Sequence, residues 1–287
     1  MTTALVTGIT GQDGSYLAEH LVDLGYRVFG LVRRDPGPMS WLAPIADRIE
    51  LLHGDLRDEA SLDAAFQRAW PDEVYNLAGQ TSVPRSWERP DQTLDINVGG
   101  LARLLHIVER RRPDARLYQA SSSDVFGNVD GRCDETTPLC PTSPYGISKM
   151  AAHRLCDAYR RRGIYAVSGI LFNHESPRRR PEMVTRKITR AAAAWARGDR
   201  TKLKLGDLQA RRDWGFAGDY VKAMHAMLQP PGPEDYVLGT GTSHSVADFV
   251  EQTLLEIRTV RGGESTFTTL EECVELDPRL LRVGEIR

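Results

Sequence analysis

The feature that most constrains the fold is a glycine-spaced turn near the N-terminus, within VTGITGQDGSYLAEHL at 6–21. The apolar run ALVT at 4–7 predicts a buried strand, and the apolar spacing after the turn predicts a helix over 15–24. Glycines between a strand and a helix let the backbone approach a pyrophosphate, which then meets the N–H groups at the helix N-terminus. The turn therefore predicts a dinucleotide site whose contacts come from Gly8, Thr10, Gly11, Gln12, Asp13 and Gly14.

Strands and helices keep alternating as far as residue 172. Further strands are expected at 27–32, 49–53, 73–78, 116–121 and 166–172, with helical patterns around 62–68, over 93–109 and over 145–161. This rhythm favours a parallel sheet with helices on both faces, and such sheets bind ligands at the carboxyl ends of their strands. The sequence therefore predicts an α/β fold with a Rossmann-type doubly wound parallel sheet, in which residues 1–172 form the dinucleotide-binding domain.

The pattern loosens after residue 172. Helices are expected over 183–197, 219–228 and 246–258, with one strand at 236–239. Residues 173–287 are therefore expected to form mainly a smaller, mixed α/β lobe at the C-terminal side, which would bind the substrate.

Composition excludes several classes of protein. The formal net charge of −2 over 287 residues gives no global attraction to nucleic acid or membranes. The four cysteines lack CxxC spacing, so neither a metal site nor a disulfide framework is expected. The N-terminus enters a strand directly, and no stretch is long and apolar enough to span a bilayer, so a cytoplasmic protein is expected.

The ends of the next strands indicate which dinucleotide binds. The second strand ends with Arg33 and Arg34, where a carboxylate would bind a bare ribose 2′-hydroxyl. Two guanidinium groups suit a 2′-phosphate, so NADP is favoured over NAD. Further contacts are expected from the turns after the third strand, with Asp55 against the adenine, and after the fourth strand, close to the nicotinamide or its phosphates: Asp55, Leu56, Leu77, Ala78, Gly79 and Gln80.

Candidate catalytic groups lie in two segments, QASSSDVFG at 119–127 and YGISK at 145–149. Tyr145 and Lys149 are one helical turn apart and project from the same face of the predicted helix. A cation beside a phenol lowers the phenol's pKa, which would let Tyr145 act as a base toward a hydroxyl that loses hydride. Asp124 could instead be an ordinary turn residue that bonds its own backbone.

In order along the chain, the glycine turn, GDL, NLAGQ and YGISK resemble the extended short-chain dehydrogenase/reductase family. At finer grain, GITGQDGSYLAEHL, LYQASSSDVFG, SPYGISK, GILFNHESPRR, VTRKI, RRDWG and DYVKAM are similar to GDP-mannose 4,6-dehydratases, along nearly the whole chain. The resemblance implies an NADP-dependent lyase that converts GDP-mannose to GDP-4-keto-6-deoxymannose. In that reaction C4 is oxidised, water is eliminated across C5–C6, and hydride returns to C6.

The resemblance also implies roles for single residues. The dehydratases use a Glu two residues after a Thr, and this chain has Asp124 and Ser122 at those positions. Ser122 would bond the C4 oxygen, while Asp124, one methylene shorter than Glu, would take the C5 proton. His174 and Arg179 would contact the cofactor, and Trp214 is expected in the core. Substrate contacts, with Lys187 and Arg212 on the diphosphate, are expected from Ser82, Ser122, Asn173, Glu175, Lys187 and Arg212.

Other activities remain open at this stage. A reductase of a GDP-4-keto-6-deoxy sugar would share the fold and the nucleotide but would need no acid–base group at C5 and C6. An epimerase, a dehydratase of another nucleotide-sugar, and a non-catalytic NADP-binding relative are further alternatives. The segment RRDPGPMSWLAPIADRIELL at 33–52 is shorter than in the family, which favours a homodimer over the family's tetramer, and the chain ends at DPRLLRVGEIR without the family's helical tail.

Overall fold

The computed structural model describes residues 1–34, 39–129, 131–260, 267 and 269–281. The chain divides into two compact units, each described here by itself. Unit 1 comprises Met1–His174 and Gly215–Leu238, and unit 2 comprises Glu175–Trp214 and Gly239–Arg287. Parts of the shortened loop and of the C-terminus, at 35–38 and 282–287, lie outside the described residues.

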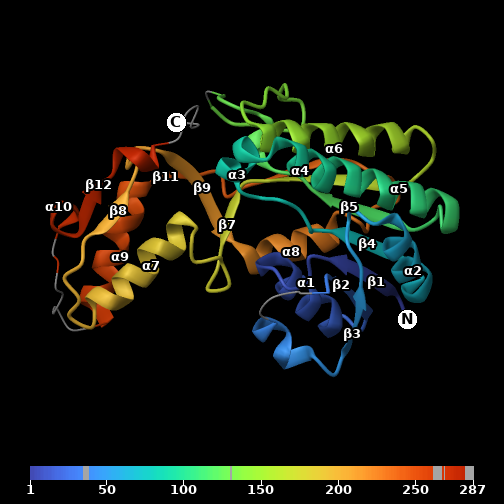
Figure 1. The fold of residues 1–287 in the computed structure, drawn as a ribbon, viewed down its shortest axis with the longest axis horizontal. Coiled ribbons are helices and arrows are strands. Elements are labelled where there is room, and N and C mark those ends of the chain that lie inside the picture. The colour runs from blue at the N-terminus through green and yellow to red at the C-terminus, as the bar shows by residue number, and fades with distance from the viewer. Residues whose placement is uncertain (35–38, 130, 261–266, 268, 282–287) are drawn as a thin grey trace. The chain divides into compact units, whose positions relative to one another are not determined.

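Within the described part of the chain, unit 1 is built on a seven-stranded parallel sheet of order β10-β6-β5-β4-β1-β2-β3. Figure 1 labels its strands β1 to β5. The strands are β1 (Thr3–Thr7), β2 (Arg27–Val32), β3 (Ile49–His53), β4 (Glu73–Asn76), β5 (Arg116–Ala120), β6 (Ala166–Leu171) and β10 (Tyr236–Leu238). The predicted Rossmann-type sheet is confirmed. Its strand order reverses between β1 and β4, which is where open α/β sheets bind ligands.

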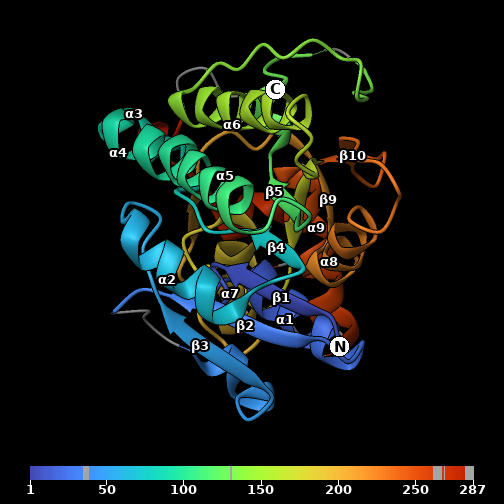
Figure 2. The ribbon, with the colours of Figure 1, turned by 90° about the vertical axis from the view of Figure 1, so that its right-hand side faces the viewer.

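Helices cover both faces of this sheet (Figure 2). They are α1 (Gln12–Asp23), α2 (Glu59–Ala69), α5 (Gly100–Arg111), α6 (Pro144–Arg160) and α8 (Ala217–Ala226), with the short η1 (Ser40–Ile45) and η3 (Ser123–Val125). Successive residues of a strand point to opposite faces, so Ala4 and Val6 pack with α1 and α8, whereas Leu5 packs with α2, α5 and α6. The two apolar layers fix the strand ends on which the candidate site depends.

The helix expected over 93–109 is interrupted in the structure. It forms α4 (Pro90–Leu94), a π-helical turn η2 (Asp95–Gly99) and α5, preceded by the unpredicted α3 (Val83–Glu88). The wider turn directs the buried Asn97 to two other segments, since its amide nitrogen donates to Ser148 Oγ at 2.9 Å and to the Gln80 carbonyl at 3.0 Å. These contacts explain why a regular helix does not form there.

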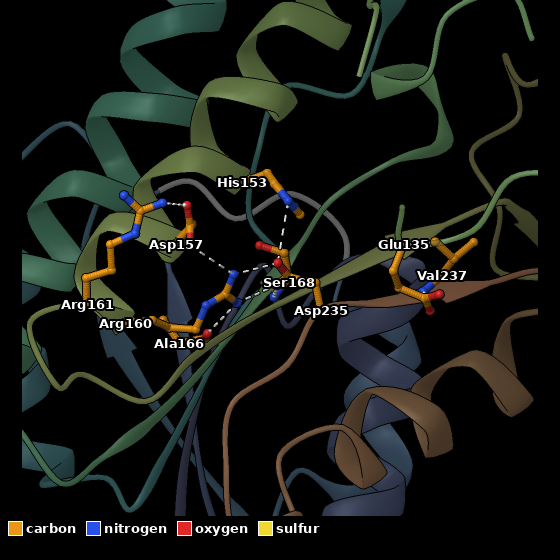
Figure 3. Close-up of polar contacts among 9 residues, drawn as sticks. All are labelled: Glu135, His153, Asp157, Arg160, Arg161, Ala166, Ser168, Asp235 and Val237. Carbon is orange, nitrogen blue, oxygen red and sulfur yellow. Dashed lines mark hydrogen bonds and ion pairs between the residues drawn. The ribbon is translucent and has the colours of Figure 1, made fainter. Parts of the chain in front are cut away.

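The segment Gly215–Leu238 falls in the range expected for the lobe, yet it belongs to unit 1. Its strand β10 pairs with β6, Tyr236 lying opposite Gly169, and α8 packs on α1. Asp235 fixes the strand, because its carboxylate accepts two bonds of 2.6 Å from Arg160 and one of 2.8 Å from the Ser168 N–H (Figure 3). The boundary expected at residue 172 therefore needs correcting, since this segment returns to complete the sheet.

Unit 2 is a small mixed α/β unit. Its described elements are α7 (Val184–Trp195), β8 (Leu203–Leu205), β9 (Arg211–Phe216), β11 (Ser243–Ser245), α9 (Val246–Val260), α10 (Leu270–Cys273), β12 (Val274–Leu276) and η4 (Pro278–Leu280), and β7 (Asn173–Glu175) is in the sheet with β9 and β11. Ile188, Trp195, Val250 and Leu254 form its core, and Trp214 packs edge-on against Phe249, with 5.3 Å between ring centroids. The expected helices over 183–197 and 246–258 are confirmed.

Candidate active site

The glycine turn joins β1 to α1 at a place where the backbone packs too closely for side chains at Gly8 and Gly14. Gly8 has φ of +70°, and a Cβ there would lie 2.9 Å from the Ala78 backbone nitrogen. A Cβ on Gly14 would lie 2.3 Å from the Gly8 carbonyl oxygen, and Gly11 caps the helix in an extended conformation, its N–H donating to the same oxygen at 2.9 Å. Thr10 lies in this turn, and Gln12 and Asp13 begin α1. The glycines thus bring the backbone close to the start of a helix, the arrangement that suits a pyrophosphate.

The turn after β4 lies against the glycine turn. The Ala78 N–H, between Leu77 and Gly79, donates to Thr7 Oγ1 at 3.0 Å. The Gln80 N–H donates to Asn97 Oδ1 at 2.8 Å, so the π-helical turn holds this segment in place. Gln80 also bonds the Ser82 backbone, and Ser82 caps α3. Sequence reasoning missed Asn97, for which a buried polar residue inside an apolar helical pattern was the available signal.

Positive charge gathers at the neighbouring strand ends. Arg33 and Arg34 are exposed directly after β2, and Asp55 follows β3 with the buried Leu56 beside it. Arg57, which the sequence did not single out, bonds Asp55 at 2.8 and 3.1 Å and lowers the pKa of that carboxyl, and the charge of Arg33 contributes to the same shift. The predicted arginine pair and Asp55 therefore share one edge of the sheet.

Tyr145 and Lys149 lie in the first two turns of α6, which Ser143 caps by accepting from the Gly146 N–H at 3.0 Å. Both side chains are buried. Lys149 Nζ donates to the Ala120 carbonyl at the end of β5, at 2.8 Å, and lies 5.8 Å from the centroid of the Tyr145 ring. Burial lowers the pKa of Lys149 to about 8, while Asp124 and Asp13 oppose that shift. The structure therefore brings the predicted Tyr–Lys pair to the end of β5.

Ser122 and Asp124 form the turn after β5, and α6 packs against it. A Cβ on Gly146 would lie 2.7 Å from the Asp124 carbonyl oxygen. Ser122 Oγ donates to Asp124 Oδ2 at 2.9 Å and accepts from the Asp124 N–H at 3.3 Å. The Asp124 carboxylate thus bonds a hydroxyl that is itself a candidate catalytic group, at the strand end that also holds Lys149.

The predicted residues after β6 divide between the two units. Asn173 begins β7, one residue after the end of β6, and His174 lies 2.9 Å from Asp13 at the glycine turn. In unit 2, Glu175 Oε2 accepts from Thr185 and lies 3.1 Å from Arg179 Nε. Further along unit 2, Lys187 lies on α7 and Arg212 on β9. Contacts of all the predicted site residues with cofactor or substrate stay predictions.

Two further observations concern the described residues. They contain no helix long and apolar enough to cross a membrane. Nor do the residues that the structure describes include three or more His, Cys, Asp or Glu side chains grouped to hold a metal ion.

Comparison with known proteins identifies the family. Residues 5–287 match the model of the GDP-mannose 4,6-dehydratase family. GDP-mannose 4,6 dehydratase 1 of Arabidopsis thaliana is 49% identical over 267 residues, which cover 86% of this chain and 73% of the relative. GDP-mannose 4,6 dehydratase 2 of the same plant is 46% identical over 297 residues, covering 99% and 77%.

A solved structure of another 4,6-dehydratase has a similar fold. The crystal structure of dTDP-glucose 4,6-dehydratase from Bacillus anthracis in complex with NAD is 25% identical, with a TM-score of 0.81, and the match covers 96% of this chain and 84% of that one. The family match spans the glycine turn, the Tyr–Lys pair and the serine–aspartate turn alike. This chain belongs to the GDP-mannose 4,6-dehydratase family.

Proposed function

We propose that this protein converts GDP-mannose to GDP-4-keto-6-deoxymannose, using NADP that is regenerated in each turnover. The observation that carries the proposal is the bond of 2.8 Å from the buried Lys149 Nζ to the Ala120 carbonyl, at the strand end from which the Ser122–Asp124 turn departs. The glycine turn follows β1 of the same sheet. The dinucleotide turn and the acid–base groups therefore share one edge of one sheet, as C4 oxidation coupled to elimination requires.

The cofactor part of the proposal concerns which dinucleotide binds. The glycine turn would hold the pyrophosphate, and the nicotinamide ring would supply the hydride acceptor and donor of the reaction. Arg33 and Arg34 support NADP over NAD, because guanidinium groups bind a 2′-phosphate through charge-assisted bonds. The double variant R33A/R34A should lose about tenfold or more in NADP⁺ affinity and keep its NAD⁺ affinity. R27A is the matched control, since Arg27 lies at the opposite end of β2.

Oxidation at C4 would depend on the pair in α6. Tyr145 would take the proton of the C4 hydroxyl, and the Lys149 ammonium would stabilise the phenolate. The bond from Lys149 to the Ala120 carbonyl fixes the position of that charge relative to the turn after β5. Ser122 would donate to the C4 oxygen. The turn after β5 and helix α6 would therefore align this oxygen together.

Elimination would depend on Asp124. A ketone at C4 acidifies the C5 proton, which the Asp124 carboxylate would accept. The same carboxyl group would then give a proton to the departing C6 hydroxyl, so that one water is lost. Hydride would return to C6, and C5 would take up a proton that balances the one Tyr145 removed from the C4 hydroxyl, giving the 4-keto-6-deoxy product with no net oxidation. Lys187 and Arg212 are proposed to bind the diphosphate.

The test is incubation of the purified protein with GDP-mannose and a trace of NADP⁺. The proposal expects a product lighter by one water and no net change in NADPH. Because Asp124 is short and bonded to Ser122, a reductase of a GDP-4-keto-6-deoxy sugar is the second candidate. Stoichiometric NADPH consumption with such a sugar would select the reductase. Tight NADP⁺ binding without turnover of either sugar would select a non-catalytic relative.

A further inference from the structure

Three buried polar side chains cross the main sheet at its carboxyl edge. Thr7 and Asn76 are the last residues of β1 and β4, Gln119 is the last but one of β5, and all three are buried. The register of the sheet places Thr7 opposite Asn76, and Asn76 opposite Gln119. Neighbouring strands of a sheet lie about 4.8 Å apart, so side chains on one face can bond in a row. We call these three residues the polar ladder.

Each member of the polar ladder bonds the next. Thr7 Oγ1 donates to Asn76 Oδ1 at 2.7 Å, and Asn76 Nδ2 donates to Gln119 Oε1 at 2.6 Å. Gln119 Nε2 then donates to the Ala120 carbonyl at 2.8 Å. The same oxygen accepts from Lys149 Nζ, also at 2.8 Å. The polar ladder therefore ends at the atom that binds the lysine of the Tyr–Lys pair.

The direction of these bonds is set at β1. The Ala78 N–H can only donate, and it donates to Thr7 Oγ1 at 3.0 Å. The proton of the Thr7 hydroxyl goes to Asn76, which must present its oxygen to β1 and its amide nitrogen to β5. Gln119 must then accept through its own oxygen, and its nitrogen is left for the Ala120 carbonyl. A backbone group in the turn after β4 thereby fixes which way both amides face.

We infer that Gln119 is a positioning residue for Lys149 and that the rest of the polar ladder fixes its amide. Two donors converge on the Ala120 oxygen, Gln119 from the sheet and Lys149 from α6. The first holds the carbonyl where the second binds it. A reversed Gln119 amide would turn its oxygen toward that carbonyl, and a buried amide with unpaired groups is costly.

The consequence concerns the partner of the lysine. Lys149 Nζ lies 5.8 Å from the centroid of the Tyr145 ring, so a lysine fixed at the end of β5 keeps its charge beside the phenol. The inference rests on the proposed function only in taking Lys149 as the partner of Tyr145. Gln119 itself would touch neither cofactor nor sugar, and its effect would pass through the Ala120 carbonyl.

The test observes the Lys149 ammonium by nuclear magnetic resonance of protein with nitrogen-labelled lysine. Its signal is assigned by its absence in Lys149→Arg, and measurement well below the pKa of about 8 keeps the group charged. An ammonium held by a hydrogen bond exchanges its protons with water slowly. Gln119→Met keeps the length of the side chain but removes both of its bonds, so this exchange should become about fivefold faster.

Thr7 tests whether the polar ladder acts as a unit, because it lies two strands away from Gln119. Thr7→Val removes the hydroxyl and lets the amides reverse, so exchange at Lys149 should again become about fivefold faster. Thr7→Ser keeps the hydroxyl and should keep the original rate. In the Gln119→Met background, Thr7→Val should change the rate less than about twofold, because the ladder is already broken.

Unchanged exchange in Gln119→Met would overturn the inference, because the carbonyl would then hold the lysine without the ladder. Effects of the Thr7 and Gln119 changes that multiply in the double variant would overturn it as well. Gln229→Met is the matched control and should keep the original rate. Gln229 bonds Glu73, at the opposite end of β4, and the His225 carbonyl.

Thermal melts of the unliganded variants separate loss of folding from loss of the lysine's position. If Gln119→Met does not fold, the two Thr7 variants decide alone, because the inference still requires faster exchange in T7V and the original rate in T7S. NADP⁺ and GDP-mannose are absent from the measurement. The polar ladder could therefore hold Lys149 in a protein that does not dehydrate the sugar, or the reverse, and the two failures remain distinct.

Discussion

Asp124 is a short acid whose carboxylate Oδ2 accepts from the Ser122 hydroxyl at 2.9 Å. Replacing it by Asn removes the proton acceptor while keeping the shape, so water loss from GDP-mannose should fall by about 10³-fold. NADP⁺ affinity should not change, since the glycine turn is untouched. Product mass and NADP⁺ titration measure the two effects. Asp124→Glu is the matched variant and should keep water loss at or above the original rate; normal turnover by D124N would reject the role given to Asp124.

Lys149 should set the alkaline side of the pH–rate profile. Burial lowers its pKa to about 8, so the ammonium proposed to stabilise the Tyr145 phenolate is lost as pH rises through that value, and turnover should fall. Arginine stays charged throughout, so Lys149→Arg should be slower but should lack this alkaline limb. Rates measured from about pH 6 to about pH 10 provide the check. An alkaline limb unchanged in K149R would show that another group titrates.

The same depressed pKa has a consequence for stability. The unfolded chain keeps the Lys149 proton up to the ordinary value of 10.5, whereas the folded protein releases it near 8. The unfolded state therefore binds more protons between these values, and the contribution of this group to the free energy of unfolding rises with pH across that window.

At the scale of elements, the junction of β1 and α1 depends on glycine packing. In Gly14→Ala the added Cβ would lie 2.3 Å from the Gly8 carbonyl oxygen and 2.6 Å from Ile9 Cα, so the helix start must shift. The free energy of unfolding should fall by about 1–3 kcal/mol, and NADP⁺ binding should weaken sharply. Thermal melting and NADP⁺ titration measure both. Gly232→Ala is the control, because a Cβ there meets nothing within 4 Å, and similar losses in both variants would contradict the packing argument.

Sequence periodicity alone predicted the bounds of some strands correctly. The bounds of β2 and β3 agree with the prediction residue for residue, because their apolar runs are short and bounded by polar turns. The π-helical turn at Asp95–Gly99 was not predictable, since Asn97 leaves the helical pattern only to bond residues distant in sequence. Arg57 was missed for a similar reason, because an arginine after a turn carries no local sign of a carboxylate partner.

The candidate site was predictable to a similar extent. Motif order located the glycine turn and Ser122 at strand ends and Tyr145 and Lys149 on a helix, and the structure brings that helix to the end of β5, where Lys149 bonds Ala120. The pairing of Asp13 with His174 joins residues 161 positions apart, and only the folded chain could reveal it. Sequence periodicity likewise gave no sign that 236–239 would pair with β6, because a short apolar strand fits a lobe as well as a sheet edge.

At the scale of the molecule, one charge cluster holds the returning segment in unit 1. Asp235 and Arg160 are 14% and 16% exposed, and removal of this negative charge would leave the buried guanidinium with a more distant carboxylate, Asp157 Oδ1 at 3.8 Å (Figure 3). Asp235→Asn should therefore lower the free energy of unfolding by about 3 kcal/mol. Arg161→Ala is the control, since Arg161 is 76% exposed and its pairing with Asp157 should contribute less than about 1 kcal/mol. Chemical denaturation of both variants is the measurement, and comparable losses would argue against a buried anchor.

The return of Gly215–Leu238 to unit 1 bears on how the chain is made. When the ribosome has translated Met1–His174, six strands of the main sheet have been made, but β6 still lacks its neighbour β10 and α1 lacks α8. The missing pieces emerge only after the whole of Glu175–Trp214 has been translated. Until then the nascent chain carries an open strand edge and an uncovered apolar helix face, both of which favour aggregation. Synthesis from N- to C-terminus thus leaves unit 1 incomplete until Glu175–Trp214 of unit 2 has been made.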